Sequence, residues 1–163
     1  MSRVAESNAE VIERFYAAFA KRDGSAMAKC YAPEARFSDP VFPDLRGREP
    51  GQMWRMLTEG GDEDSDLEVE LLGHSAEGDT GAAHWRATYT FPQTGRPVVN
   101  DIRANFHFKD GKIVDHVDAF DFHKWAGQAL GLQGKLLGWT PVLRGVVRRT
   151  AGKRLDEFIA EDS

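Results

Sequence analysis

The sequence predicts an α+β fold shaped like a cone, in which N-terminal helices pack inside a strongly curved antiparallel sheet and a helical tail follows. Three observations predict it. Apolar residues recur at helical spacing early in the chain, alternate with polar residues over residues 66–122, and return to helical spacing from about residue 123. Helices followed by consecutive strands are typical of the α+β class. We expect one domain over residues 1–163, with a core at about 7–122 and a C-terminal extension at about 123–163.

The first helix is marked by a capping signal and an apolar face. Ser7 is expected to start it, because Glu10 stands three residues later, as a capping box requires. The residues at helical spacing behind this start are Val11, Phe15, Ala18 and Phe19, with Ile12 and Tyr16 beside them. This helix is therefore expected to fill the inside of the cone.

Two more helices and a short strand follow before the sheet. A helix is expected over residues 25–31, ending at the Ala32-Pro33 step, since the residue before a proline avoids the helical region. A short alternating run at 35–38 reads as a strand that delivers Asp39 into an Asp-Pro step. The next helix is bracketed by Pro50 and a glycine pair at 60–61.

Four alternating runs in series predict an antiparallel meander. They are separated by short links that carry glycine or proline, and they cover residues 66–74, 81–91, 98–108 and 112–122. A curved sheet wrapped around a long helix leaves a cone with one open end. Such a hollow is a natural pocket for a small hydrophobic molecule.

Composition excludes several classes of function. The net charge of −5 gives no reason to expect nucleic acid as a partner. The single cysteine, Cys30, excludes a disulfide framework and a multi-cysteine zinc site, and no histidine pair has metal-binding spacing. No glycine-rich nucleotide loop is present, so we expect no cofactor. The N-terminus has no apolar leader, and no uncharged run approaches the ~20 residues of a membrane span, so a cytoplasmic location is expected.

The order of elements resembles the nuclear transport factor 2-like superfamily. The segments that carry the resemblance are "IERFYAAFAKRD", "YAPEARFSDPV", "LRGREPGQMWRML" and "NFHFKDGKIVDHVDAFD", which together cover roughly residues 7–122. Within the superfamily the chain is most similar to ketosteroid isomerases and SnoaL-type polyketide cyclases. The resemblance implies a cofactor-free isomerase or cyclase that acts on a small hydrophobic carbonyl compound, polyketide- or steroid-like.

The resemblance also implies three catalytic residues. In the isomerases the aspartate of the Asp-Pro step is the general base, and Asp39 matches it. The cyclases use an aspartate on a late strand with a histidine nearby, which Asp118 and His116 match. Either aspartate would abstract a proton next to the carbonyl, and His116 would return it or polarise the oxygen.

The inward direction of these side chains depends on strand register. Because strand side chains alternate, His116, Asp118 and Phe120 share a face. The alternatives are that this polar pair lies on the solvent face, or that a shift by one residue turns a different set inward. That set would be Asp115, Val117, Ala119 and Asp121.

The chain departs from the isomerases at both oxyanion donors. The tyrosine position falls on Phe15, with Tyr16 about 100° around the helix. The protonated-aspartate position falls on Ala104. Loss of both donors argues against steroid isomerisation by the family route. The residues expected to contact substrate are Phe15, Tyr16, Trp54, Ala104, Phe106 and Phe120.

Two other functions remain open at this stage. A hydrolytic variant of the superfamily uses an Asp-Arg-Asp arrangement, but alternation puts Asp101 and Arg103 on the face opposite Asp118. A non-catalytic small-molecule-binding or oligomerisation module is the other alternative. A homodimer is expected to form through the outer sheet face, which carries His84, Arg86, Asp101, Arg103 and His107.

The tail interleaves apolar residues with basic ones. The six basic residues are Lys135, Arg144, Arg148, Arg149, Lys153 and Arg154. One interpretation is an amphipathic segment that contacts a membrane or acidic lipid. The other is a tail whose apolar side covers the cone or forms an oligomer interface. We favour the second at this stage, because six charges fit a solvated helix face as well as a lipid headgroup layer.

Overall fold

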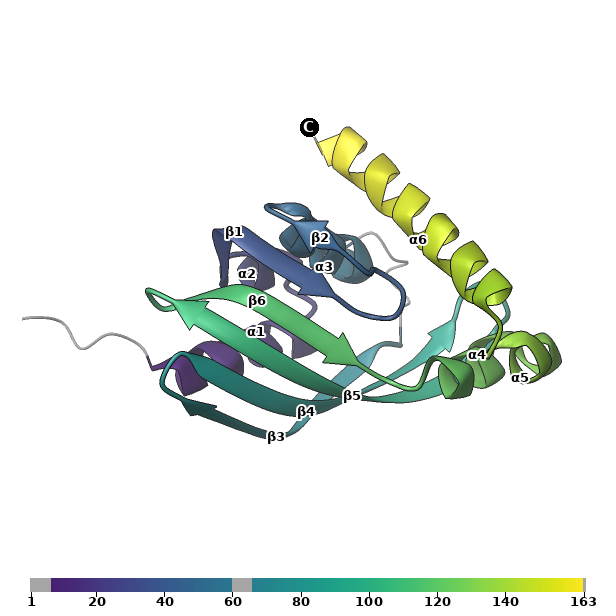
Figure 1. Ribbon diagram of the computed structural model, residues 1–163, viewed down its shortest axis with the longest axis horizontal. Coiled ribbons are helices and arrows are strands. Elements are labelled where there is room, and N and C mark those ends of the chain that lie inside the picture. Colours follow the sequence, from purple (N-terminus) through teal and green to yellow (C-terminus); the bar gives the residue numbers. More distant parts are fainter. Residues whose placement is uncertain (1–6, 60–65, 163) are drawn as a thin grey trace, which may run out of the picture.

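The computed structural model describes residues 7–59 and 66–162, and its centre is a curved sheet with helices on one side (Figure 1). The N-terminal helices are α1 (Asn8–Ala20), α2 (Gly24–Ala28) and α3 (Glu49–Glu59). Helix α1 packs against the strands at one edge of the sheet, and α3 packs on α2 and the opposite edge. The predicted α+β fold is confirmed.

The start of α1 has the predicted capping box. The Ser7 hydroxyl accepts a hydrogen bond from the backbone N–H of Glu10, whose carboxylate accepts one from the Ser7 N–H. The predicted apolar face is buried, with Phe15 fully enclosed. Local capping and burial of one face therefore place α1 where the sequence pattern indicates.

The predicted meander is confirmed. Its strands pair antiparallel in series and are β3 (Glu68–Glu77), β4 (Thr80–Phe91), β5 (Arg96–Lys109) and β6 (Lys112–Ala119). The β5–β6 turn carries Asp110 at φ 53° and Gly111 at φ 76°, the left-handed backbone that tight hairpins need and Asp-Gly supplies. Tight turns thus fix the register of the sheet.

The segment before Asp39 corrects two predictions. Helix α2 ends at Ala28, and Tyr31, expected in that helix, begins β1 (Tyr31–Ser38). The Ala32-Pro33 step, expected to end a helix, lies inside β1. The pairing of β1 with β6 is irregular between Tyr31 and Arg36, where a missing proline N–H is tolerated. Strand β1 pairs with β6 in parallel, which local pattern alone does not reveal.

The sheet order is β2-β1-β6-β5-β4-β3, with β2 (Leu45–Arg46) at the edge beside β1. Strand β6 is therefore central, between β1 and β5. The glycine pair at 60–61, expected to end α3, and the N-terminal residues 1–6 lie outside the described residues.

The tail forms α4 (Phe122–Leu130), α5 (Leu132–Leu137) and α6 (Pro141–Asp162). Helix α6 is continuous over 22 residues, and Pro141 occupies its first position. Figure 1 shows α4 and α5 at one end of the sheet and α6 running back from there. At its far end the Asp162 carboxylate accepts hydrogen bonds from Gln52 and Arg55 of α3.

None of the described helices is both long and apolar enough to cross a membrane.

The core has two connected parts. The larger lies between α1, α3 and the inner sheet face, and it includes Leu155 of α6. The smaller part lies between α4 and the N-terminal end of β5, and it contains Val98, Phe122 and Trp125. Three partly buried residues pack against both parts: Val41, Tyr89 and Phe120. The tail therefore covers the open end expected for the cone.

Candidate functional site

Strand β6 turns His116 and Asp118 inward, as predicted. His116 is 0% exposed and Asp118 is 4% exposed. On β5 they face Phe106 and Ala104, respectively. The alternative register is excluded, because Val117 is 40% exposed and points to the outer face. Two polar side chains are thus held in an otherwise apolar interior, where each needs a partner.

The partners form one continuous hydrogen-bond chain. His116 Nε2 lies 2.8 Å from Asp118 Oδ1, and His116 Nδ1 lies 2.8 Å from the Tyr31 hydroxyl. The Trp54 indole N–H donates to that hydroxyl over 2.8 Å. The indole N–H can only donate, so the Tyr31 hydroxyl accepts that hydrogen bond and donates its own to His116 Nδ1. A neutral His116 therefore carries its proton on Nε2 and donates it to Asp118.

The sequence pattern does not mark Tyr31, because it predicts a helix for that segment. Ala35 and Phe37 show the alternation of a buried strand face, but Pro33 is exposed and the strand pairing is irregular there. The period of two therefore does not extend back to Tyr31. Strand β1 thus positions the Tyr31 hydroxyl on His116, and helix α3 positions the Trp54 indole N–H on that hydroxyl.

Asp39 is both a turn residue and a carboxyl whose pKa is influenced by the charge of Asp118. Its Oδ1 accepts the backbone N–H groups of Val41 and Phe42 at 2.7 and 2.6 Å. Burial raises the pKa of Asp39 to about 7, repulsion from Asp118 adds to the rise, and the backbone hydrogen bonds oppose it. The charge of Asp118 therefore acts on Asp39, which means that the two carboxyls lie within electrostatic range of each other.

Helix α6 adds a cation to this site. Arg148 donates from Nε to the Pro40 carbonyl over 2.9 Å, and its charge lowers the pKa of Asp39. The sequence shows Arg148 only as one of the basic residues of the tail. No local signal links it to Asp39, since the contact joins residues 108 positions apart.

Tyr16 has a buried hydroxyl with no hydrogen-bond partner. The side chain is 3% exposed, with its ring 5.1 Å from Phe15 and 5.8 Å from Trp85, centroid to centroid. Burial raises the pKa of Tyr16 well above its usual value, and the neighbouring charge of Asp118 raises it further. The Trp85 indole N–H is buried and unpartnered too. Such orphaned donors are rare and costly in folded proteins.

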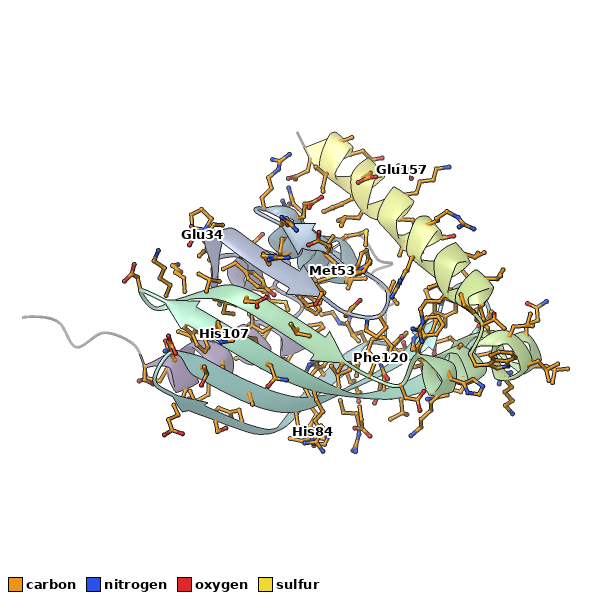
Figure 2. The ribbon with its side chains drawn as sticks, in the orientation of Figure 1. Glu34, Met53, His84, His107, Phe120 and Glu157 are labelled. Atoms are coloured by element: carbon orange, nitrogen blue, oxygen red, sulfur yellow. The ribbon has the colours of Figure 1, made fainter. Side chains whose placement is uncertain are left out.

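The interior around these groups is filled by side chains, whereas we expect an open pocket there. Phe106 packs on the His116 ring at 4.4 Å between centroids, and Phe15, Trp54 and Ala104 are buried as well. Phe120 is only partly buried and lies where β6 leads into α4 (Figure 2). Two surface hollows lie elsewhere, one of about 700 Å³ beside β3 and one of about 570 Å³ beside α4.

The outer sheet face carries the second group of polar residues, as predicted. Arg86 Nε donates to Asp101 over 2.9 Å, and His84 lies 3.6 Å from the same carboxylate. Figure 2 shows His84 and His107 on the sheet. Asp101 and Arg103 are exposed on this face while Asp118 is inside, so the hydrolytic Asp-Arg-Asp arrangement is not assembled. Among residues 7–59 and 66–162, no three His, Cys, Asp or Glu side chains are grouped to hold a metal ion.

Known structures share this fold. A protein from Catenulispora acidiphila with a ketosteroid isomerase-like fold, in complex with trimethylamine, superposes with a TM-score of 0.65 at 18% identity, over 81% of this chain and 98% of that one. IdmH, a proposed polyketide cyclase from Streptomyces antibioticus, gives 0.62 at 23% identity, over 78% and 100%. An LEH-like epoxide hydrolase from M. tuberculosis gives 0.60 at 18% identity, over 83% and 94%. No curated protein matches the sequence.

At these sequence identities the structural similarity shows the fold alone, and the chemistry depends on the residues of the site. The family profile is more specific, since it matches the sequence itself over residues 12–116. The match begins in α1 and ends at His116. It covers most of the core and none of the tail. The chain belongs to the SnoaL-like domain family.

Proposed function

We propose that this protein is a cytoplasmic, cofactor-free isomerase or cyclase that moves a proton next to the carbonyl group of a small hydrophobic, polyketide- or steroid-like molecule. One observation carries the proposal. A buried hydrogen-bond chain from Trp54 through Tyr31 and His116 ends on Asp118, and Asp118 is electrostatically coupled to Asp39, whose pKa is about 7. A carboxyl with a perturbed pKa that is coupled to a buried polar network is typical of acid–base sites.

Asp39 is the general base of the proposed reaction. A carboxyl with a pKa of about 7 is a stronger base than an ordinary aspartate and still half ionised at neutral pH. Its Oδ1 is occupied by two backbone N–H groups, so Oδ2 takes the proton from the carbon beside the carbonyl. The protonated Asp39 then returns that proton at the second carbon or to the oxygen, while His116 and Asp118 stay hydrogen-bonded to each other beside the reacting carbon.

Tyr16 supplies the oxyanion donor that Phe15 and Ala104 lack. Its raised pKa keeps the hydroxyl protonated, and the hydroxyl has no partner inside the protein. A substrate carbonyl oxygen would satisfy it, and the hydrogen bond would strengthen as charge develops on that oxygen. One donor in place of two suits a substrate whose enolate is itself delocalised.

Entry requires side chains to move, because His116 is fully buried. The seam between the two core parts is the proposed route, since Val41, Tyr89 and Phe120 are only partly buried there. Asp39 adjoins this seam through Val41. A hydrophobic substrate would displace these side chains and keep the interior free of water.

Hydrogen–deuterium exchange tests the proposal without knowledge of the full reaction. A panel of hydrophobic ketones and poly-β-ketones is incubated with the protein in D₂O, and incorporation at the carbon beside the carbonyl is followed by mass spectrometry. Catalysed exchange is expected with the native chain and lost with Asp39→Asn. Asp44→Asn, an exposed matched control, should exchange as the native chain does. Equal exchange by Asp39→Asn would remove Asp39 from the mechanism.

The closed interior favours one second candidate, a binding module without catalysis. In that case a ligand from the same panel would raise the melting temperature of the protein by mass action. No ketone would exchange, and Asp39→Asn would keep the thermal shift. The pair of measurements therefore separates the two functions.

A further inference from the structure

The junction of α5 and α6 exposes several large apolar side chains. Elsewhere in the described residues such exposed side chains are scattered: Leu57, Leu72, Val99 and Val117. Those at the junction are 43% to 76% exposed, and we call them the apolar corner: Leu132, Leu136, Leu137, Trp139, Val142 and Val146. A gathering of this kind marks an interaction surface.

These residues lie on α5, on the start of α6 and in the link between them, at one end of the molecule (Figure 1). Leu132 and Leu136 are four apart on α5, and Val142 and Val146 are four apart on α6, so each pair shares a helix face. Trp139 stands in the link between the helices and is 71% exposed. Figure 1 shows this link at one end of the molecule. The tail thus covers the cone with α4 and leaves this corner uncovered.

The corner lies in a strongly basic segment of an acidic protein. Residues 131–155 contain six basic side chains and no acidic one, although the chain as a whole has a net charge of −5. Two of the six turn to the body of the protein. Arg144 lies over the Phe122 ring at 5.0 Å, and Arg148 binds the Pro40 carbonyl.

The exposed cations extend the apolar corner. Arg149 and Lys153 follow Val146 at helical spacing and continue the same face of α6, and Lys135 stands beside Leu136 on α5. The acidic residues of α6 begin at position 156. Glu157 lies toward the opposite end of the helix, about 22 Å along the axis from its first turn (Figure 2).

We propose that the apolar corner docks on a membrane surface that contains anionic lipid. Trp139 and the leucines enter the interfacial layer, and Lys135, Arg149 and Lys153 contact the headgroups. Two copies meeting through this corner would bring like charges together, which is unfavourable, whereas an anionic bilayer complements them. The acidic end of α6 then faces away from the lipid.

Tryptophan fluorescence offers a direct test with the intact chain. Of the four tryptophans, Trp54, Trp85 and Trp125 are 3%, 4% and 7% exposed, so Trp139 alone reports contact at the corner. With vesicles of phosphatidylcholine and phosphatidylglycerol we expect a blue shift of the emission and co-sedimentation of the protein. Both should weaken as salt screens the charges, and both should be much smaller with phosphatidylcholine alone.

Paired variants separate the apolar and the electrostatic parts. Leu136→Ser with Val142→Ser should reduce partitioning into the mixed vesicles more than tenfold. Arg149→Gln with Lys153→Gln should reduce it by about fivefold per cation removed. The matched controls are Leu57→Ser on α3 and Lys109→Gln on β5, exposed residues away from the corner. Circular dichroism confirms that each variant is folded.

Three outcomes overturn the proposal. The native chain fails to sediment with the mixed vesicles, or the Leu136→Ser, Val142→Ser variant sediments as well as the native chain. The third outcome is that no lipid binding is seen and that sedimentation velocity shows a native dimer, which the Leu136→Ser, Val142→Ser variant does not form. The apolar corner would then be an interface between two copies of the chain.

Discussion

A phenol buried without a hydrogen-bond partner is the least expected single residue in this protein. Tyr16 leaves its hydroxyl unpaired within a packed aromatic core, and an unsatisfied buried donor costs about 1–3 kcal/mol. Tyr31, in contrast, makes two hydrogen bonds. We therefore expect the Tyr31 hydroxyl to contribute to stability and the Tyr16 hydroxyl to contribute to function.

Replacing each tyrosine with phenylalanine should have opposite effects on stability. Tyr16→Phe should leave the free energy of unfolding unchanged or raise it by about 1 kcal/mol, because it removes an unpaired group. Tyr31→Phe should lower it by about 1–3 kcal/mol, since the Trp54 N–H and His116 Nδ1 lose their partner. Urea unfolding measures both.

The proposed oxyanion role of Tyr16 also predicts how Tyr16→Phe changes catalysis. Tyr16→Phe should lower the rate of deuterium exchange by about 10²-fold. A stable Tyr16→Phe protein with native exchange rates would show that the hydroxyl takes no part in the reaction.

Asp39 should make the protein less stable as the pH rises toward neutral. Its pKa is about 7 in the folded state against an ordinary value of 3.8, so between these values the folded protein holds a proton that the unfolded chain has released. Solvent at this partly exposed residue reduces the effect to about 2 kcal/mol, roughly half of the full shift. Asp39→Asn should remove this fall in urea titrations run between pH 4 and 8.

Other carboxyls act outside that window. Their pKa values are lowered, so their contribution is lost only below the ordinary value of 3.8; they are Asp44, Asp66, Asp101 and Asp162. An equally steep loss of stability above pH 4 in Asp39→Asn would therefore assign the pH dependence to a different group.

At the scale of elements, β6 and α6 do the positioning. Strand β6 is central in the sheet, so its inward residues are enclosed by β1 on one side and β5 on the other. Helix α6 brings Arg148 to the turn that holds Asp39. The site is thus built by the family core and adjusted by an element outside the family match at residues 12–116.

Removal of the α6 cation should change the acid–base behaviour of Asp39. The charge of Arg148 lowers the pKa of Asp39, so Arg148→Gln should raise that pKa further. The acidic limb of the exchange rate against pH should move to higher pH, while Arg154→Gln, an exposed change on the same helix, should leave it in place. If the acidic limb of the pH–rate profile does not move in Arg148→Gln, then α6 does not influence the pKa of Asp39.

At the scale of the whole molecule, one fully buried side chain stands out on α6. Leu155 joins the main core, while the α3 contacts to Asp162 are partly exposed. The other apolar residues of α6 that pack against the two core parts are only partly buried: Leu143, Val147, Ala151 and Ile159. Leu155 is therefore the most deeply buried contact between α6 and the rest of the protein.

Shortening the Leu155 side chain should destabilise the protein. Leu155→Ala is expected to lower the free energy of unfolding by about 3 kcal/mol, through lost burial and the cavity left behind. Leu132→Ala, at a residue that is 70% exposed, should change it by less than about 0.5 kcal/mol. Similar values for both in chemical denaturation would mean that α6 does not depend on Leu155.

The homodimer through the outer sheet face stays a prediction. If it forms, Val99, 45% exposed on that face, lies in the interface. Val99→Glu should then dissociate the dimer in sedimentation velocity, and Leu57→Glu on α3 should leave it intact. A monomeric native chain would refute the prediction.

Sequence pattern alone determined much of this protein. The capping box at Ser7, the alternation in four strands and the Asp-Gly turn before Lys112 each act over a few residues, so each can be read locally. The same alternation placed His116 and Asp118 on one face of their strand, and the resemblance to known proteins predicted that this face points inward. The resemblance to known proteins supplied Asp39.

Tertiary structure decided what depends on distant contacts. Three features join segments at least 79 positions apart: the parallel pairing of β1 with β6, the position of Tyr31 on His116, and the contact of Arg148 with the Asp39 turn. Tertiary packing also closed the interior and left the apolar corner exposed. Local propensity carries no information on such contacts, because their free energy arises only when the folded chain brings the partners together.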